Sequence, residues 1–222
     1  KVYETRDGRA MSFRPEENAR RMAHTCAKIM MAPPAEDMFV EAVDRAVKLN
    51  RRFIPPYGSG ASLYIRPLLI GITGTVGIKP SREYLFVVFV TPVGPYFRSG
   101  LTPVKLMVEE VVDRASPGGI GDAKTGGNYA AGMRATYAAR EKGFSEVLFL
   151  DARTKRYIDE SGSSNFFAIT RDGTYVTPES PSILDSITNK SLIELAKDMG
   201  IRVERRPVDV AELPNFAEAG LI

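Results

Sequence analysis

The sequence of 222 residues contains one cysteine, one histidine and no tryptophan, and these shortages exclude several kinds of chemistry. Cys26 cannot form an internal disulfide, so the cysteine content does not fix the redox compartment of the protein, although it favours the cytosol. A zinc cluster of cysteines and histidines needs about four such ligands. His24 and Cys26 stand two apart on an expected helix, where they do not face each other. We expect His24 to be a core or partly buried residue, and a catalytic proton carrier to be lysine, tyrosine or a carboxylate.

Long apolar runs and a strong net charge are also missing. The longest uninterrupted apolar run is Leu85 to Val90, far short of the ~20 residues that span a bilayer. Thirty basic and 27 acidic residues give a net charge of +3, too even to indicate a nucleic acid or an anionic membrane as partner. With 44% hydrophobic and 26% charged residues, the composition is that of one large or two small folded domains.

Turn residues and hydrophobic periodicity predict an α+β fold in two lobes. The smaller lobe should span residues 1–93, the interdomain loop residues 94–103, and the larger lobe residues 104–222, because prolines and glycines concentrate between Thr91 and Pro103. In the smaller lobe we expect a hairpin around Asp7-Gly8, a helix starting at Pro15, a helix at Glu36–Asn50, and strands at Ala61–Ile72 and Glu83–Val90.

In the larger lobe we do not expect a regular alternation of strands and helices. Asn128 is expected to cap a helix that runs to about Lys142. Strands are expected at Val104–Val112, Val147–Asp151, Lys155–Asp159, Asn165–Thr170 and Arg202–Pro207, and a helix at Ser186–Met199. The last residues, up to Ile222, look acidic and helix-like, with no closing motif. Because the chain opens at Lys1 inside a strand-like segment, we expect a fragment or a processed chain, and a removed targeting peptide stays possible.

A lysine set among glycines is the strongest chemical feature of the sequence. Lys124 lies in Gly118–Tyr129, where glycines would let the backbone approach a flat or phosphorylated ligand. Such a lysine can contact phosphate or form an imine, and a flexible loop with a solvated lysine is the plain alternative. A P-loop nucleotide site is a rival, since Gly118, Lys124 and Thr125 fit its pattern and Asp151 follows an apolar strand. Against it, Ala123 replaces the glycine before the lysine, and Gly126–Gly127 would fall in a helix turn.

Three further patterns could bind anions or a ligand nitrogen. Tyr64 and Arg66 share one face of an expected strand and together suit a carboxylate, although a surface pair explains them equally. Glu160 enters a turn rich in serine and glycine, as a turn residue or as a carboxylate aimed at a ligand. Ile187-Thr188 opens a helix, where free amides can bind phosphate or be capped in the ordinary way.

Taken jointly, these segments resemble the branched-chain amino-acid aminotransferases, which are pyridoxal-phosphate enzymes of fold type IV. The resemblance covers essentially the whole chain. It is carried by Phe13–Met22, Ser62–Pro67, Pro92–Phe97, Lys124–Tyr129 and Glu160–Asn165. It implies a two-lobed α+β homodimer that exchanges the amino group between leucine, isoleucine or valine and 2-oxoglutarate.

The resemblance also implies roles around the cofactor, pyridoxal 5′-phosphate. Lys124 would hold it as an imine and, once released, would move the proton between the substrate Cα and the cofactor. Tyr129 would bond the phenolic oxygen, and Glu160 would keep the pyridine nitrogen protonated. The implied phosphate contacts are Arg21, Ile187 and Thr188.

Substrate contacts are implied as well. Tyr64 would bind the α-carboxylate and Arg66 the side-chain carboxylate of glutamate. Ser163 is a further substrate-site residue, Tyr96 belongs to the interdomain loop over the site, and Ile78 to a loop that completes the partner subunit's apolar pocket.

The sequence departs from the family in places. Asp185-Ser186 replaces the usual Pro-Gly, and Asn189 stands where arginine is common. The family also continues at both ends, so the second lobe is expected to be incomplete and this chain to be poor or inactive alone. Alternatives are a D-amino-acid aminotransferase or a pyridoxal-phosphate lyase, which the Tyr64–Arg66 pair argues against, the P-loop nucleotide binder, and a catalytically inactive fragment.

Overall fold

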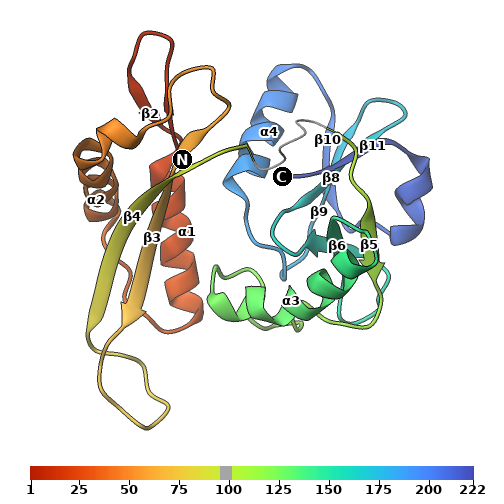
Figure 1. Cartoon of the computed structure of the whole chain (residues 1–222). Helices are drawn as coiled ribbons and strands as arrows, with labels where there is room; N and C mark the ends of the chain where they lie inside the picture. Colours follow the sequence, from red (N-terminus) through yellow and green to blue (C-terminus); the bar gives the residue numbers. More distant parts are fainter. Residues whose placement is uncertain (96–101) are drawn as a thin grey trace. The chain divides into compact units, whose positions relative to one another are not determined.

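The computed structural model describes residues 1–95 and 102–222, which form two compact units, Lys1–Thr102 and Pro103–Ile222 (Figure 1). The predicted interdomain residue Tyr96 lies outside the described residues. None of the helices in the described ranges is long and apolar enough to cross a membrane.

The first unit contains a four-stranded antiparallel sheet in the order β2-β1-β3-β4. Its strands are β1 (Val2–Glu4), β2 (Ala10–Ser12), β3 (Ser62–Gly71) and β4 (Tyr84–Val93). The Asp7-Gly8 turn is present, with Gly8 in the left-handed region at φ 76°. β4 runs three residues beyond the expected Val90, because it is an edge strand and can include Pro92, which stands opposite Leu63.

Two helices, α1 (Pro15–Lys28) and α2 (Glu36–Leu49), pack on one face of this sheet, and the short 3-10 turn η1 (Arg51–Phe53) follows. Their core includes Phe39, stacked on Phe86 of β4 with ring centroids 5.8 Å apart. The expectation that His24 is a core or partly buried residue is wrong: His24 is exposed, whereas the buried residues of α1 are Ala19, Thr25 and Cys26.

The other face of the β3–β4 pair stays exposed although it is apolar. Leu68 and Ile70 of β3 are 41% and 42% exposed, and Phe89 of β4 is 46% exposed. Alternation along each strand places these side chains opposite those that pack on the helices.

The second unit holds two sheets, ordered β5-β6-β7 and β10-β9-β8-β11. Their strands are β5 (Leu106–Glu109), β6 (Glu146–Leu150), β7 (Ile158–Ser161), β8 (Phe166–Thr170), β9 (Tyr175–Pro178), β10 (Val203–Arg206) and β11 (Phe216–Leu221). The helices are α3 (Gly126–Glu141), α4 (Ile187–Asp198) and the 3-10 helix η2 (Val210–Asn215). Leu148, Ile158 and Phe166 form the centre of a core shared by both sheets.

Several expected strands differ in this unit. The predicted strand Val104–Val112 shrinks to β5, and β9 was not predicted. The C-terminal segment is helical only in part: the 3-10 helix η2 is followed by β11, which pairs antiparallel with β8. Cross-strand pairing there overrides the helix preference of its alanines and glutamate. β7 begins at Ile158 instead of Lys155, because the preceding residues form a turn around the Asp151 carboxylate.

Candidate active site

The glycine-rich segment brings an amine and a phenol together. Lys124 precedes Thr125, the N-cap residue of α3, and Tyr129 lies in the first turns of that helix. The Lys124 Nζ donates a hydrogen bond to the Tyr129 hydroxyl at 2.7 Å and lies 5.1 Å from the ring centroid. Both side chains are exposed. A Cβ added to Gly126 or Gly127 would meet no described atom within 4 Å, so the start of α3 is open to a ligand.

The predicted cap Asn128 is wrong, and its side chain has a different use. The N-cap is Thr125, three residues earlier, because its extended backbone (φ −115°, ψ 151°) sets the boundary, and α3 begins at Gly126. The Asn128 Nδ2 donates instead to the carbonyls of Ile120 at 2.6 Å and Ala123 at 2.7 Å. Asn128 therefore holds the loop that carries Lys124.

Asp151, which would bind magnesium in the P-loop interpretation, has other partners in the structure. The Asp151 carboxylate accepts hydrogen bonds from the amides of Thr154, Arg156 and Tyr157, and from the Thr154 hydroxyl. Burial would raise the pKa of Asp151, but these hydrogen bonds outweigh it and lower the pKa to about 2. Asp151 thus shapes a turn. Gly126 and Gly127 do lie in the first turn of α3, however, so the cost of glycine in a helix does not by itself exclude a P-loop.

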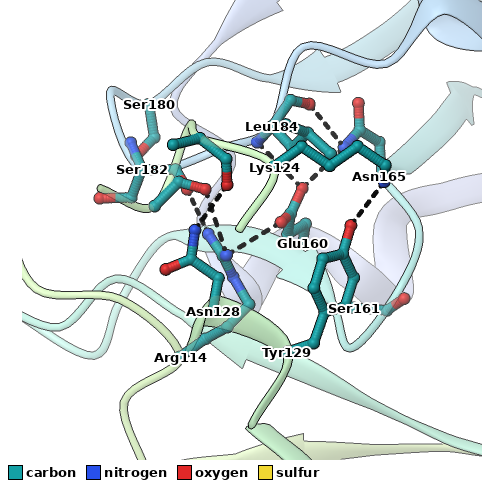
Figure 2. A network of polar contacts seen from close by, with 12 residues as sticks. Arg114, Lys124, Asn128, Tyr129, Glu160, Ser161, Asn165, Ser180, Ser182 and Leu184 are labelled. Carbon is teal, nitrogen blue, oxygen red and sulfur yellow. Dashed lines mark hydrogen bonds and ion pairs between the residues drawn. The ribbon is translucent and has the colours of Figure 1, made fainter. Parts of the chain in front are cut away.

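Glu160 is a buried carboxylate with a defined set of partners. It is the penultimate residue of β7, pairs with Asn165 across the serine-rich turn, and is 7% exposed. Its Oε2 accepts from Asn165 Nδ2 at 2.7 Å and from the Leu184 amide at 3.2 Å, and its Oε1 lies 3.1 Å from Arg114 Nη1 (Figure 2). Burial raises the pKa of Glu160 to about 7, although the positive charge of Arg114 opposes the rise. The neighbouring Asp159 is also buried, which raises the pKa of its carboxyl.

Sequence reasoning missed Arg114, which is 6% exposed. Its Nη1 lies 3.4 Å from the Gly121 carbonyl, and its Nη2 donates to the Ser182 carbonyl. Figure 2 shows Arg114 joined to Glu160, which also accepts from Asn165. Nothing in the sequence separates Arg114 from the other arginines, because its contacts come from segments distant along the chain. Asn165 belonged to a recognised segment but was given no role.

The start of α4 offers backbone donors. Ser186 caps the helix, since its side chain accepts from the Asn189 amide at 3.2 Å. The amides of Ile187 and Thr188 belong to the first turn, where an α-helix has no internal acceptors for them. A cavity of about 190 Å³ lies nearby. Its lining includes Asn165, Leu184, Asn189, Lys190 and Arg205.

The two family departures at α4 have structural partners. Asp185 pairs with Lys190 at 2.6 Å. Asn189 accepts from the Tyr175 hydroxyl at 2.9 Å and donates to Thr177 Oγ1 at 2.9 Å. Asn189 therefore ties α4 to β9, and its amide side chain adds no positive charge beside the first turn of the helix.

The remaining predicted residues lie in the first unit or in turns. Arg66 Nη2 lies 3.5 Å from the Tyr64 hydroxyl on one face of β3, with its guanidinium 5.3 Å from the ring centroid. Arg21 is a partly buried residue of α1. Ile78 is fully exposed in the loop between β3 and β4, and Ser163 is exposed in the turn after β7.

Comparison with known proteins adds independent findings. The family model described as Amino-transferase class IV matches residues 1–222. A branched-chain-amino-acid aminotransferase of Helicobacter pylori is 44% identical over 222 residues, covering 99% of this chain and 65% of that protein. The chloroplastic branched-chain-amino-acid aminotransferase 5 of Arabidopsis thaliana is 49% identical over 219 residues, covering 98% of this chain and 52% of that protein. The chain thus spans between half and two thirds of these relatives.

Solved structures give the same picture of the fold. The crystal structure of the T.th. branched-chain amino acid aminotransferase with pyridoxamine 5′-phosphate matches with a TM-score of 0.83 at 26% identity, covering 100% of this chain and 70% of that one. The same enzyme complexed with N-(5′-phosphopyridoxyl)-L-glutamate matches with a TM-score of 0.81 at 28% identity, covering 100% and 70%. The predicted α+β fold of type IV aminotransferases is confirmed.

Proposed function

The chain belongs to the Amino-transferase class IV family, and on that premise we propose that its protein transfers the amino group between branched-chain L-amino acids and 2-oxoglutarate with pyridoxal phosphate as cofactor. The observation that carries the proposal is the Lys124–Tyr129 pair, 2.7 Å apart at the open start of α3. The relatives named above are branched-chain aminotransferases, which supports this substrate class.

The donor groups of the second unit fit pyridoxal phosphate. Lys124 would be the covalent anchor and Tyr129 the partner of the phenolic oxygen. Glu160, a buried acceptor, would pair with the pyridine nitrogen, and the first-turn amides of α4 suit a phosphate. Arg21 of the first unit is proposed as a further phosphate contact. When bound, the cofactor supplies an electron sink that stabilises negative charge at the substrate Cα.

The chain's own residues would then manage protons and charge. The Lys124 amine would take the proton from the substrate Cα and deliver it to the C4′ position of the cofactor. The Tyr129 hydroxyl, its hydrogen-bond partner, would orient that amine. The Glu160 carboxylate would keep the ring nitrogen protonated. A buried ring nitrogen without such an anionic partner would lose its proton.

Substrate recognition is proposed for the Tyr64–Arg66 pair. The guanidinium and the phenol are adjacent on one strand face, as a carboxylate receptor requires. Ser163 and Tyr96 are proposed as further contacts. Arg66→Ala should weaken turnover with glutamate by about tenfold more than turnover with leucine, measured as kcat/KM for each donor. Equal losses would move the side-chain carboxylate receptor elsewhere and reopen the D-amino-acid and lyase alternatives.

A homodimer is proposed on the exposed apolar face of β3–β4 and the loop that carries Ile78. Leu68, Ile70 and Phe89 are more than 40% exposed, and Val76 and Ile78 are fully exposed. Such surfaces mark protein contacts, and the loop would complete the apolar pocket of the partner subunit. Sedimentation of Ile78→Asp should show a weakened dimer, and an unchanged dimer would exclude this loop from the interface.

A cytosolic location also stays a prediction, supported by Cys26, a free buried thiol. The Arabidopsis relative is named chloroplastic, so a compartment can differ among relatives. Fractionation of cells that express the whole protein tests the prediction, and recovery with an organelle would contradict it.

Replacing Lys124 tests the proposed function. Lys124→Ala should abolish transamination between leucine and 2-oxoglutarate in the whole protein, because the covalent anchor and the proton carrier are lost together. Lys197→Ala, which removes an exposed lysine at the end of α4, is the matched control and should keep full turnover. Turnover by Lys124→Ala would sink the assignment. An active whole protein beside an inactive 222-residue chain would support the inactive-fragment alternative for the chain alone.

A further inference from the structure

Arg114 is a buried arginine whose guanidinium contacts three separate segments. It reaches the Gly121 carbonyl in the loop before Lys124, the Glu160 carboxylate on β7, and the Ser182 carbonyl in the segment before α4 (Figure 2). Burying a guanidinium costs free energy unless its partners are well placed. These three segments carry the proposed anchor, the proposed ring partner and the proposed phosphate amides.

We propose that Arg114 is a positioning residue for the cofactor ring: it favours the carboxylate form of Glu160 and locks the Glu160 strand to the lysine loop and to the segment that leads into α4. The proposal rests on the proposed function, because it assigns Glu160 to the pyridine nitrogen. It adds a role for a residue that does not itself reach the reacting atoms.

The charges around Glu160 show why a cation is needed. Burial favours the neutral carboxylic acid and raises the pKa of Glu160 to about 7. Asp159 raises the pKa further, whereas Arg114, the Leu184 amide and the Asn165 side chain lower it. Arg114 supplies the positive charge among these groups. Without it, Glu160 would be largely protonated near neutral pH, and a protonated carboxyl group cannot hold a proton on the ring nitrogen.

The packing shows why the cation is an arginine. The lysine loop and the α4 segment touch, since a Cβ added to Gly121 would lie 2.6 Å from the Ser182 carbonyl oxygen. A planar guanidinium can reach Gly121, Ser182 and Glu160 at once, whereas a lysine ammonium is a single point of charge. The Arg114 Nε is buried with no hydrogen-bond partner among the described residues. The polar contacts of the Arg114 side chain are therefore made by its two terminal nitrogens.

The test uses the whole protein with pyridoxal phosphate and compares Arg114→Gln with Arg156→Gln. Arg156 is an exposed arginine paired with Asp209, and its replacement is the matched control. In Arg114→Gln we expect the affinity for pyridoxal phosphate and kcat to fall about tenfold or more, the effect of losing a hydrogen bond to a charged group. The absorption of the bound cofactor should acquire a new titration above pH 7, and kcat should rise with pH across it. Arg156→Gln should match the parent in all three readouts.

Two further variants keep the test decisive if Arg114→Gln folds poorly. Arg114→Lys keeps the positive charge but not the two terminal nitrogens of the guanidinium. It should therefore restore the pH dependence of kcat more fully than the affinity for pyridoxal phosphate. In a Glu160→Gln background, replacing Arg114 should leave the cofactor spectrum nearly unchanged, because Arg114 acts through Glu160. If Arg114→Gln or Arg114→Lys keeps the parent's spectrum, affinity and pH profile, the inference fails while the proposed function stands. If the parent itself binds no pyridoxal phosphate at Lys124, the proposed function fails first.

Discussion

Two acidic residues nine positions apart in the second unit meet opposite environments. Asp151 lies in a turn whose backbone amides converge on it, and its pKa is lowered to about 2. Glu160 lies in a buried strand with one arginine, one asparagine and one amide, and its pKa is raised to about 7. The Asp151 carboxylate uses its hydrogen-bonding capacity to hold the turn. The Glu160 carboxylate is held in an unfavourable setting, which is typical of a group kept for a ligand.

The largest expected effect is on catalysis. Glu160→Gln should lower kcat by roughly a hundredfold, because a neutral amide cannot keep the pyridine nitrogen protonated. Asp151→Asn should leave kcat within about twofold, since Asp151 only shapes a turn. Steady-state kinetics of both variants check this contrast. Equal losses of kcat in the two variants would contradict a catalytic role for Glu160 and a purely structural role for Asp151.

The next effect is on stability as a function of pH, and its sign should be opposite at the two sites. The folded pKa of Asp151 lies below its ordinary value of 3.8, so its stabilisation is present above pH 4 and is lost as the pH falls toward 2, by roughly 2 kcal/mol. The folded pKa of Glu160 lies above its ordinary value of 4.5, so the folded state binds more protons than the unfolded state between pH 4.5 and 7. Its contribution to stability therefore falls as the pH rises through that range.

Denaturant unfolding of the cofactor-free protein measures these slopes. Asp151→Asn should reduce the loss below pH 4, and Glu160→Gln should reduce the loss between pH 4.5 and 7. A Glu160→Gln protein that keeps the parent's slope across the second range would contradict the assignment of that proton to Glu160.

The smallest expected effect belongs to Asn128, which shapes a loop as Asp151 does but in the loop that carries Lys124. Asn128→Ala removes two hydrogen bonds to backbone carbonyls. It should cost about 1–2 kcal/mol of stability and lower kcat severalfold, because Lys124 becomes less well placed. Asn50→Ala, which removes one bond to the Ala46 carbonyl in α2, is the control. It should lower the midpoint of unfolding without lowering kcat, and equal kcat losses would contradict a role for Asn128 in placing Lys124.

Local signals predicted the helices well, whereas contacts distant in sequence escaped prediction. α2 and α4 end within a residue of their predicted ends, because breakers and periodicity lie within the segments themselves. β11 and the partners of Arg114 depend on pairing across the chain: Arg114 contacts Ser182, 68 positions away. The family resemblance assigned both Lys124 and Tyr129 to the cofactor, and the structure adds the hydrogen bond between them. The burial of Glu160 could not be predicted from the sequence, since it depends on Arg114, Asn165 and Leu184 together.

The most direct measurement is reductive trapping. The whole protein is incubated with pyridoxal phosphate, reduced with borohydride and digested, and the label is mapped by mass spectrometry. A single phosphopyridoxyl label on Lys124 is the predicted result. A label on another lysine of a folded protein, or no label above the background of exposed lysines, would contradict the account.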